Sequence, residues 1–397
     1  MQSLNIEEPF TGKYALFELG FRPFFLLAGL SALVLVMSWV GVYLGLPTYA
    51  SYYGPLMWHG HEMIFGYAVA VIAGFLLTAV GNWTGQKMPK NRPLIALVVL
   101  WCLGRLLPFV HEFIPVWLIA GVDILFLPCV GLVIGHAVLK SKNKRNLFFI
   151  PVFSLLTVAN VLMHLDAQAG FDGIGKIGER MALGIVVLIV GVIGGRVIPF
   201  FTQAGLRGFK ATMSDSVNKL SIVAVAMFAV LYAFLGQQSM AVGVAALVTA
   251  GIHSVKLKGW YTSRIWGEPL LWVLHLSYIW FIVGLVLLGV ESFVPLLGKP
   301  GLHALTVGLI GGITLGMMSR VSLGHTGRPL QIVSAIKLAF ILINIATLLR
   351  VFMPLVSPDF YQLAVTVSGV LWCIAFVLFL LVYTPVLIYP RVDGRPG

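Results

Sequence analysis

The sequence predicts an all-α polytopic membrane protein of about twelve transmembrane helices. Composition, the length of the apolar segments and the placement of the basic residues each point to this class. The 397-residue chain is 59% hydrophobic and only 10% charged, whereas a soluble domain has roughly 25% charged residues. So few polar side chains cannot cover a water-exposed globule. The formal net charge of +12 is dispersed between apolar runs, so no nucleic-acid partner is expected.

The apolar stretches have the length that a membrane span requires. Roughly 20 residues cross about 30 Å of hydrocarbon when they form a helix. The third and eighth stretches are the weakest of the series. The predicted spans are 21–45, 57–80, 93–110, 115–139, 147–166, 180–200, 218–236, 239–256, 268–290, 302–323, 331–354 and 361–388.

The two ends of the chain are short and polar. Residues 1–20 contain Glu7, Glu8 and Glu18 and lack the apolar core of a signal peptide, so the first span is expected to remain in the protein. We therefore predict an N-terminal segment at 1–20, one helical bundle at 21–388 and a C-terminal tail at 389–397.

Basic residues mark one side of the membrane. Most of the 26 lysines and arginines lie near the chain ends or in the connections after spans two, four, six, eight and ten. The positive-inside rule places that side, and both termini, in the cytoplasm. The alternation also favours an even number of spans. These basic connections are expected to contact anionic membrane lipids.

A weak internal repeat relates three of the spans. His61 is followed 23 residues later by Thr84, and His303 is followed at the same distance by Thr326. Arg196 follows Glu179 by 17 residues, as Arg320 follows His303. Spans two, six and ten would then be equivalent, and the bundle would consist of three four-helix blocks.

The strongest candidate site is the segment Trp58-His59-Gly60-His61-Glu62 at the start of span two. Imidazole is a good ligand for haem iron and copper, and an adjacent carboxylate can orient it. Residues two apart on a helix point about 200° from one another, so His59 and His61 are expected to face different partners. The alternative is a pair of interfacial histidines.

Two further histidines lie on spans that could face this segment. His303 opens span ten on the same side of the membrane as His61, and histidines at matched depth suit an axially ligated haem. His275 lies about seven residues inside span nine, too deep to reach water easily. It is a candidate ligand or proton relay, or else a hydrogen-bonding partner of a neighbouring helix.

The remaining histidines fall at span ends. His325 lies 22 residues after His303, roughly 33 Å along a helix, so these two cannot share one site. His111, His136, His164 and His253 are expected to be interfacial. His111 and His164, on the extracytoplasmic side, are alternative candidates for a copper site.

Other ionisable residues lie within apolar segments. Arg196 and Arg320, near the cytoplasmic ends of spans six and ten, are candidates for an anion or proton pathway, although arginines there often extend to the interface. Glu62 and Asp123 are expected to face the bundle interior, Asp123 in a polar network. Glycines at 308, 312 and 316 form a stripe that favours close helix packing.

At four separated segments the sequence resembles the NnrS family of membrane proteins. The resemblance runs from Phe17 almost to the C-terminus. Its most specific segments are 58–63 with 82–85, 194–202, 271–275 and 303–329.

Membership of that family implies a twelve-span bacterial cytoplasmic-membrane protein that contains haem, with copper, and acts in nitric oxide metabolism and protection from nitrosative stress. Nitric oxide would be its small ligand, and a membrane electron donor is unidentified. The residues that match the family segments are His59, His61, His275, His303 and His325. We expect His61 and His303 to be the first axial pair, with His59 and His275 as further ligands or relays and Glu62, Arg196 and Arg320 in supporting positions.

The architecture is also similar to the large subunit of haem-copper oxidases, which likewise has histidines on spans two and ten. Spans six and seven of this chain contain no histidine, so an oxygen- or nitric-oxide-reducing binuclear centre is not expected. Two alternatives come from other classes. One is a cofactor-free, proton-coupled transporter with a path along Glu62, His275 and Arg320; the other is a metal-cofactor assembly factor. Whether the protein is an enzyme stays open.

Overall fold

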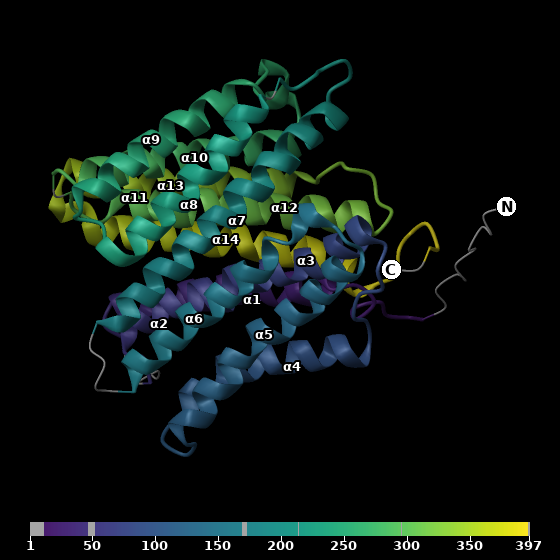
Figure 1. Ribbon diagram of the computed structural model, residues 1–397, viewed down its shortest axis with the longest axis horizontal. Coiled ribbons are helices and arrows are strands. Elements are labelled where there is room, and N and C mark those ends of the chain that lie inside the picture. The colour runs from purple at the N-terminus through teal and green to yellow at the C-terminus, as the bar shows by residue number, and fades with distance from the viewer. Residues whose placement is uncertain (1–11, 47–51, 169–172, 213, 295, 396–397) are drawn as a thin grey trace.

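The computed structural model describes residues 12–46, 52–168, 173–212, 214–294 and 296–395. Figure 1 shows a bundle of long helices that run broadly along one direction, with α4 and α5 at one edge and α9 and α10 at the other. Twelve of the described helices are long and apolar enough to cross a membrane. No strand occurs within these ranges. The predicted all-α, multi-pass membrane class is confirmed.

Several spans contain more than one helical segment. A π-helix is written η here, as is a short 3-10 helix. The elements are α1 (Phe21–Tyr43), α2 (Pro55–His61), η1 (Glu62–Ala68), α3 (Val69–Thr84), α4 (Arg92–Leu106), η2 (Leu107–Val110), α5 (Val116–Lys140), η3 (Lys144–Asn146), α6 (Phe149–Ala167), α7 (Ile174–Gly205), α8 (Asp215–Leu235), α9 (Met240–Lys258), η4 (Ser263–Gly267), α10 (Pro269–Glu291), α11 (Pro300–His303), η5 (Ala304–Gly311), α12 (Gly312–His325), α13 (Ser334–Val356), η6 (Pro358–Phe360) and α14 (Tyr361–Ile388).

The predicted span positions agree with these helices, and the largest difference is at span six. The apolar run predicted 180–200, but α7 extends over Ile174–Gly205. Lys176, Glu179 and Arg180 lower the hydropathy of its first turns without disfavouring a helix, because charged straight-chain residues are good helix formers. Hydropathy therefore identified the apolar part of α7 and missed the helical turns on either side of it.

Three spans form the interior of the bundle. The apolar windows of spans two, six and ten are 89%, 72% and 78% buried, whereas that of span three is 28% buried. These inner spans comprise α2–η1–α3, α7 and α11–η5–α12. They are the same three that the weak repeat relates, but the division into three four-helix blocks stays a prediction.

A π-helix follows the histidine in two of the inner spans. Segment η1 begins directly after His61, and η5 begins directly after His303. A π-helix inserts an extra residue per turn and is frequent at functional sites. In both spans the π-helix therefore rotates the turn that contains the histidine relative to the α-helix that follows.

The glycine stripe of span ten serves helix packing. A Cβ atom at Gly308 would lie 2.5 Å from Trp280 Cγ, one at Gly312 would lie 2.4 Å from Ser277 Oγ, and one at Gly316 would lie 2.8 Å from Val273 Cγ1. All three partners belong to α10. Span ten therefore approaches α10 as closely as the absence of side chains allows, as the sequence indicated.

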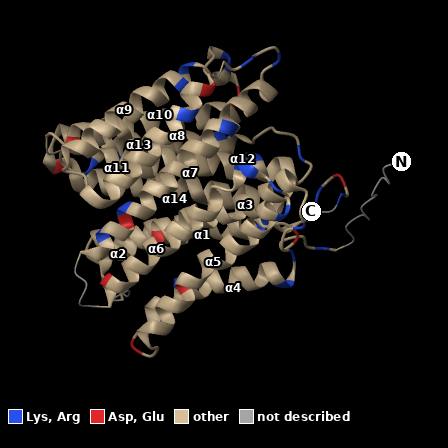
Figure 2. Cartoon of the chain, in the orientation of Figure 1, with Lys and Arg blue, Asp and Glu red and all other residues tan. Residues whose placement is uncertain are grey.

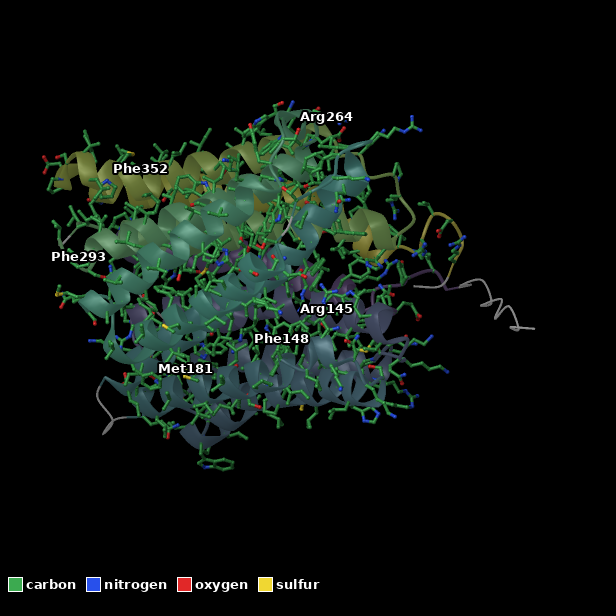
Figure 3. The ribbon with its side chains drawn as sticks, turned by 45° about the horizontal axis from the view of Figure 1, so that its top comes forward. Arg145, Phe148, Met181, Arg264, Phe293 and Phe352 are labelled. Atoms are coloured by element: carbon green, nitrogen blue, oxygen red, sulfur yellow. The ribbon has the colours of Figure 1, made fainter. Side chains whose placement is uncertain are left out.

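Basic residues gather at one end of the bundle. Figure 2 shows most of the blue segments, the lysine and arginine positions, near the end that carries the described C-terminal tail. Figure 3 places Arg145 and Arg264 toward this end and Phe293 at the other. Arg264 donates to the carbonyl of Arg207 at 3.0 Å, which joins two basic connections. We call this the basic end; the positive-inside rule predicts that it faces the cytoplasm.

The first and last spans are joined at the basic end. The Ala15 N–H donates to the Ile388 carbonyl at 2.8 Å. Arg22, fully buried, donates from Nη1 to the carbonyls of Leu387 at 2.9 Å and Tyr389 at 2.8 Å. Its guanidinium thus satisfies carbonyls at the end of α14 that have no intrahelical partner.

We expect Arg22→Met to destabilise the bundle by about 1.5–3 kcal/mol, the range for hydrogen bonds to a charged group. Unfolding in a denaturing-detergent titration, followed by circular dichroism, measures this loss. Arg92→Met is the matched control, because Arg92 is exposed at the start of α4. Equal stabilities of the two variants would contradict this role for Arg22.

Candidate functional site

A cluster of buried polar side chains lies at the end of the bundle opposite the basic end. It is assembled from spans two, three, four and five and from the segment that precedes α2. We call it the His61 cluster. Its members are Tyr53, His61, Glu62, Arg105, Asp123, Asn160 and His164.

His61 is the residue that most of the cluster contacts. Its Nδ1 lies 3.0 Å from Glu62 Oε1. Its Nε2 lies 2.8 Å from Asn160 Oδ1 and 3.2 Å from Asp123 Oδ2, with the Tyr53 hydroxyl at 3.1 Å. If Nδ1–H donates to Glu62, a neutral ring presents the Nε2 lone pair to two oxygen acceptors. A cation at Nε2, either a proton or a metal ion, would remove this repulsion.

Asp123 connects His61 to His164. Asp123 Oδ2 accepts from His164 Nε2 at 2.9 Å and from Asn160 Nδ2 at 3.1 Å. The other imidazole nitrogen of His164 lies 2.8 Å from the Tyr52 hydroxyl, which donates to it. One ligand atom from each of His61, Asp123 and His164 lies within 4.8 Å of the other two. Two imidazoles and one carboxylate are a donor set that a transition metal accepts.

The charges of the cluster leave one negative charge in excess. Arg105 is paired with both carboxylates, donating to Glu62 Oε1 at 2.6 Å and to Asp123 Oδ1. With both histidines neutral, the two carboxylates therefore exceed the single guanidinium by one. Glu62 is 2% exposed and Asp123 is 4% exposed, so an uncompensated charge there is costly.

A monovalent cation would neutralise the cluster. Burial raises the pKa of the Tyr53 phenol well above its ordinary value of 10.0, so this residue stays uncharged and supplies no second negative charge. A single proton or Cu(I) would balance the one excess negative charge of the cluster. A divalent ion would give the cluster a net charge of one positive unit. Imidazole nitrogen is a suitable ligand for copper.

His59 faces away from the His61 cluster. Its ring stacks on Trp39 of α1, with centroids 4.3 Å apart, and its buried Nδ1 has no hydrogen-bond partner among the described residues. The expectation that His59 and His61 face different partners is confirmed. An unpartnered buried imidazole nitrogen is what a metal ligand presents before the metal is bound.

His303 lies near His59. The two rings are close enough to interact electrostatically, and Arg350 is near both. Arg350 Nη2 donates to His303 Nε2 at 3.0 Å, and His303 Nδ1 donates to the Lys299 carbonyl at 2.9 Å. Among the described residues, His303 and His61 share no hydrogen-bond partner. The structure thus brings His303 together with His59, while the axial pairing of His303 with His61 stays a prediction.

Span six contributes a carboxylate to the same end. A Cβ atom at Gly60, between the two histidines of span two, would lie 2.4 Å from Glu179 Oε1. The Glu179 carboxylate therefore occupies the space that a side chain at residue 60 would take. Residues that the repeat relates, His61, Glu179 and His303, all lie on the inner spans at this end of the bundle.

His275, Arg320, Arg196 and His325 lie elsewhere. His275 is buried in α10; its Nδ1 donates to the Leu271 carbonyl at 3.0 Å, and its Nε2 has no hydrogen-bond partner in the described part of the chain. Arg320 lies over the Phe201 ring at 4.0 Å. The other two are at the basic end: Arg196 donates to Asn146 Oδ1 at 3.1 Å, and the His325 carbonyl accepts from Arg391 at 2.8 Å.

Two histidines expected at the interface are buried, and that expectation was wrong. His164 is 1% exposed and belongs to the His61 cluster; His253 is also 1% exposed and lies 2.5 Å from the Tyr278 hydroxyl. Both lie in the last turns of apolar helices, where hydropathy does not distinguish a lipid-facing from an inward-facing position. His111 lies in the connection between η2 and α5, and His136 is exposed.

Comparison with known proteins agrees with this architecture. A family model described as NnrS protein matches residues 15–391, nearly the whole chain. The chain belongs to the NnrS family. None of the curated proteins searched matches it. NnrS membership extends over every span and both histidine sites, so the four-segment resemblance seen in the sequence is confirmed.

Proposed function

We propose that this NnrS protein is a haem- and copper-containing protein of the bacterial cytoplasmic membrane that binds nitric oxide and contributes to nitric oxide metabolism and protection from nitrosative stress. The observation that carries the proposal is the His61 cluster. It combines two imidazoles, a carboxylate and one excess negative charge in a fully buried place.

Copper fits the His61 cluster. His61 Nε2, His164 Nε2 and Asp123 Oδ2 would hold it, and Glu62 would orient His61 through the hydrogen bond to Nδ1. Arg105 would hold both carboxylates in place and limit the charge that the site can accept. Asn160 positions Asp123 by donating to Oδ2.

One observation at the end of spans two and ten opposite the basic end fits haem. His59 Nδ1 is buried and has no hydrogen-bond partner among the described residues. The contacts favour His59 as a ligand. Both ring nitrogens of His303 have partners, the Lys299 carbonyl and Arg350, so His303 would serve as a haem ligand, with His59 or with His61 as the sequence favoured, only after Arg350 releases Nε2. His275, with its unpartnered Nε2, is a further candidate. Haem iron supplies diatomic-ligand binding or electron transfer, depending on whether an axial position is open. Arg350 would place a positive charge beside the His303 ring.

A small apolar pocket offers a place for a small uncharged ligand. It lies where the three inner spans meet, with walls from Val71 of α3, Ile193 of α7 and Ile313 of α12. Nitric oxide is small and uncharged, so it can enter such a pocket from the bilayer without losing hydrogen bonds. The pocket supports the choice of ligand class and is independent of the metal sites.

We expect the purified protein to be pigmented and to contain copper. His164→Ala should reduce copper by more than half while leaving the haem Soret band, because His164 belongs only to the His61 cluster. His59→Ala and His303→Ala should weaken or shift the Soret band and leave copper in place. Absorption spectra and elemental analysis of the same preparations measure both. His136→Ala, at an exposed position, is the control.

A colourless, copper-free preparation from cells with ample haem and copper would overturn the proposal. The cofactor-free transporter would then remain, in which a proton neutralises the His61 cluster. Its predicted path runs along Glu62, His275 and Arg320, and no hydrogen bond joins any two of these residues in the described part of the chain. A metal that is bound weakly, with a defect confined to the maturation of another enzyme, would instead favour the assembly factor.

A further inference from the structure

A cavity of about 670 Å³ opens at the basic end between the start of α8 and the end of α9. Its size falls in the usual range for small-ligand sites. Its wall includes no residue of the His61 cluster and neither His59 nor His303, although His275 lies near the Trp260 backbone. Its walls are formed by Thr212, Ser214, Val217, Asn218, Val255, Lys256, Lys258, Gly259 and Trp260.

The walls are rich in hydrogen-bond donors and contain no carboxylate. Lys256 and Lys258 bring two ammonium groups, and Asn218 brings an amide. Trp260 is fully buried, its indole Nε1 has no accessible surface, and its ring centroid lies 5.5 Å from Lys256 Nζ. A wall with two ammonium groups and an amide but no carboxylate suits a ligand that accepts hydrogen bonds and carries negative charge.

Lys256 is the group that most needs an acceptor. It is 7% exposed, and its Nζ donates to Ser221 Oγ at 2.9 Å. Within the described ranges no carboxylate lies within ion-pair distance of it. An ammonium group buried without a counter-charge is unfavourable unless an anion binds or the proton is lost.

The wall around Lys256 is held by close backbone contacts. The Thr212 N–H donates to the Gly259 carbonyl at 2.9 Å, which fixes the α7–α8 connection against the end of α9. A Cβ atom at Gly259 would lie 2.2 Å from the Thr212 carbonyl oxygen. Only glycine permits this approach, so the two sides of the cavity are positioned before any ligand arrives.

From these observations we propose that the cavity binds a phosphate group through Lys256, Lys258 and the Asn218 amide. A phosphate group offers several acceptor oxygens and at least one negative charge, which matches the donors and the unpaired ammonium. Val217 and Val255 provide an apolar side next to the donors, which suits the glycerol and first acyl carbons of a phospholipid. Free phosphate satisfies the same donors, and the experiment distinguishes the two sources.

The test uses the full-length protein, purified in detergent and stripped of lipid. Phosphatidylglycerol is compared with uncharged diacylglycerol, and sodium phosphate with sodium chloride at equal ionic strength. Native mass spectrometry counts bound lipid, and the rise in Tm with probe concentration gives apparent affinity. Lys256→Met should weaken binding at least tenfold. Lys140→Met, an exposed lysine of α5 at the same end, should not change it.

The arms give distinct results. If the wild type retains phosphatidylglycerol and Lys256→Met does not, the site exists and its ligand is a lipid headgroup. If sodium phosphate raises the Tm of the wild type and not that of Lys256→Met, the site exists and its ligand is a free anion. Without any probe, Lys256→Met should be as stable as the wild type or more so, because an unpaired buried charge has been removed. If neither probe binds to the wild type, or if Lys256→Met binds like the wild type, the proposal is wrong. Because metal content is not a readout, this result is separable from that of the proposed function.

Discussion

Arg105→Met is expected to lower the free energy of unfolding by about 3–5 kcal/mol, the cost of leaving a buried charge without its partner. The guanidinium pairs with both Glu62 and Asp123, and only 11% of its side chain is exposed. Methionine preserves much of the side-chain volume, so the loss of stability would come from the missing charge rather than from poorer packing. Unfolding in a denaturing-detergent titration gives the magnitude.

A compensated variant separates charge from geometry. Glu62→Gln and Asp123→Asn, added to Arg105→Met, remove the two carboxylates whose charge the arginine balances. Most of the lost stability should return, because neutral polar groups cost far less to bury than ions. The triple variant should nevertheless contain no copper, since Asp123 no longer offers a charged oxygen. Should it be as unstable as the single variant, the arginine would be acting through packing alone.

Gly178→Ala is expected to destabilise the bundle by about 1–3 kcal/mol and to reduce copper content. The added Cβ would lie 2.5 Å from the Ala159 carbonyl oxygen of α6, and a backbone atom cannot move away without moving its helix. Overpacking a tight contact costs about this much. Asn160 and His164 lie on the same helix, so its displacement should change the distances within the His61 cluster.

Gly121→Ala is the matched control in a neighbouring span. No atom lies within 4 Å of a Cβ built at Gly121, so alanine there should be neutral or slightly stabilising, as expected for a helix interior. Comparing the copper content and the free energy of unfolding of the two variants separates the effect of disturbing the α6–α7 contact from the effect of replacing any glycine by alanine. Equal copper in both would exclude an influence of that contact on the cluster.

The membrane architecture was accessible from the sequence because the bilayer imposes a length and an apolar composition on each span. Even the weak third and eighth segments appear as spans, Arg92–Val110 and Met240–Lys258. The sequence did not show which face of each helix points into the bundle and which points outward. His164 and His136 both lie near the ends of apolar helices, yet one is buried and the other exposed, since neighbouring helices decide which face is covered.

The candidate site was predictable only in part. His61, Glu62 and Asp123 were expected to face inward, because ionisable groups in spans rarely face lipid. His61 meets Asn160 across 99 residues, and Asp123 meets His164 across 41, and no local pattern encodes such contacts. Arg105 was missed, although a signal existed. Spans three and four are antiparallel neighbours with a short connection, so Arg105 and Asp123, at the same end of the two, were candidates to meet.

The hydrogen bonds between Arg22 and the end of α14 join residues up to 367 positions apart. During synthesis at roughly 5–20 residues per second, the buried arginine must wait about 20 to 70 seconds for its acceptors to be made. Until then its charge needs water or lipid phosphate at the membrane surface. Release from the insertion machinery should therefore depend on the last span, and nascent chains that stop before residue 386 should be early targets of membrane proteases.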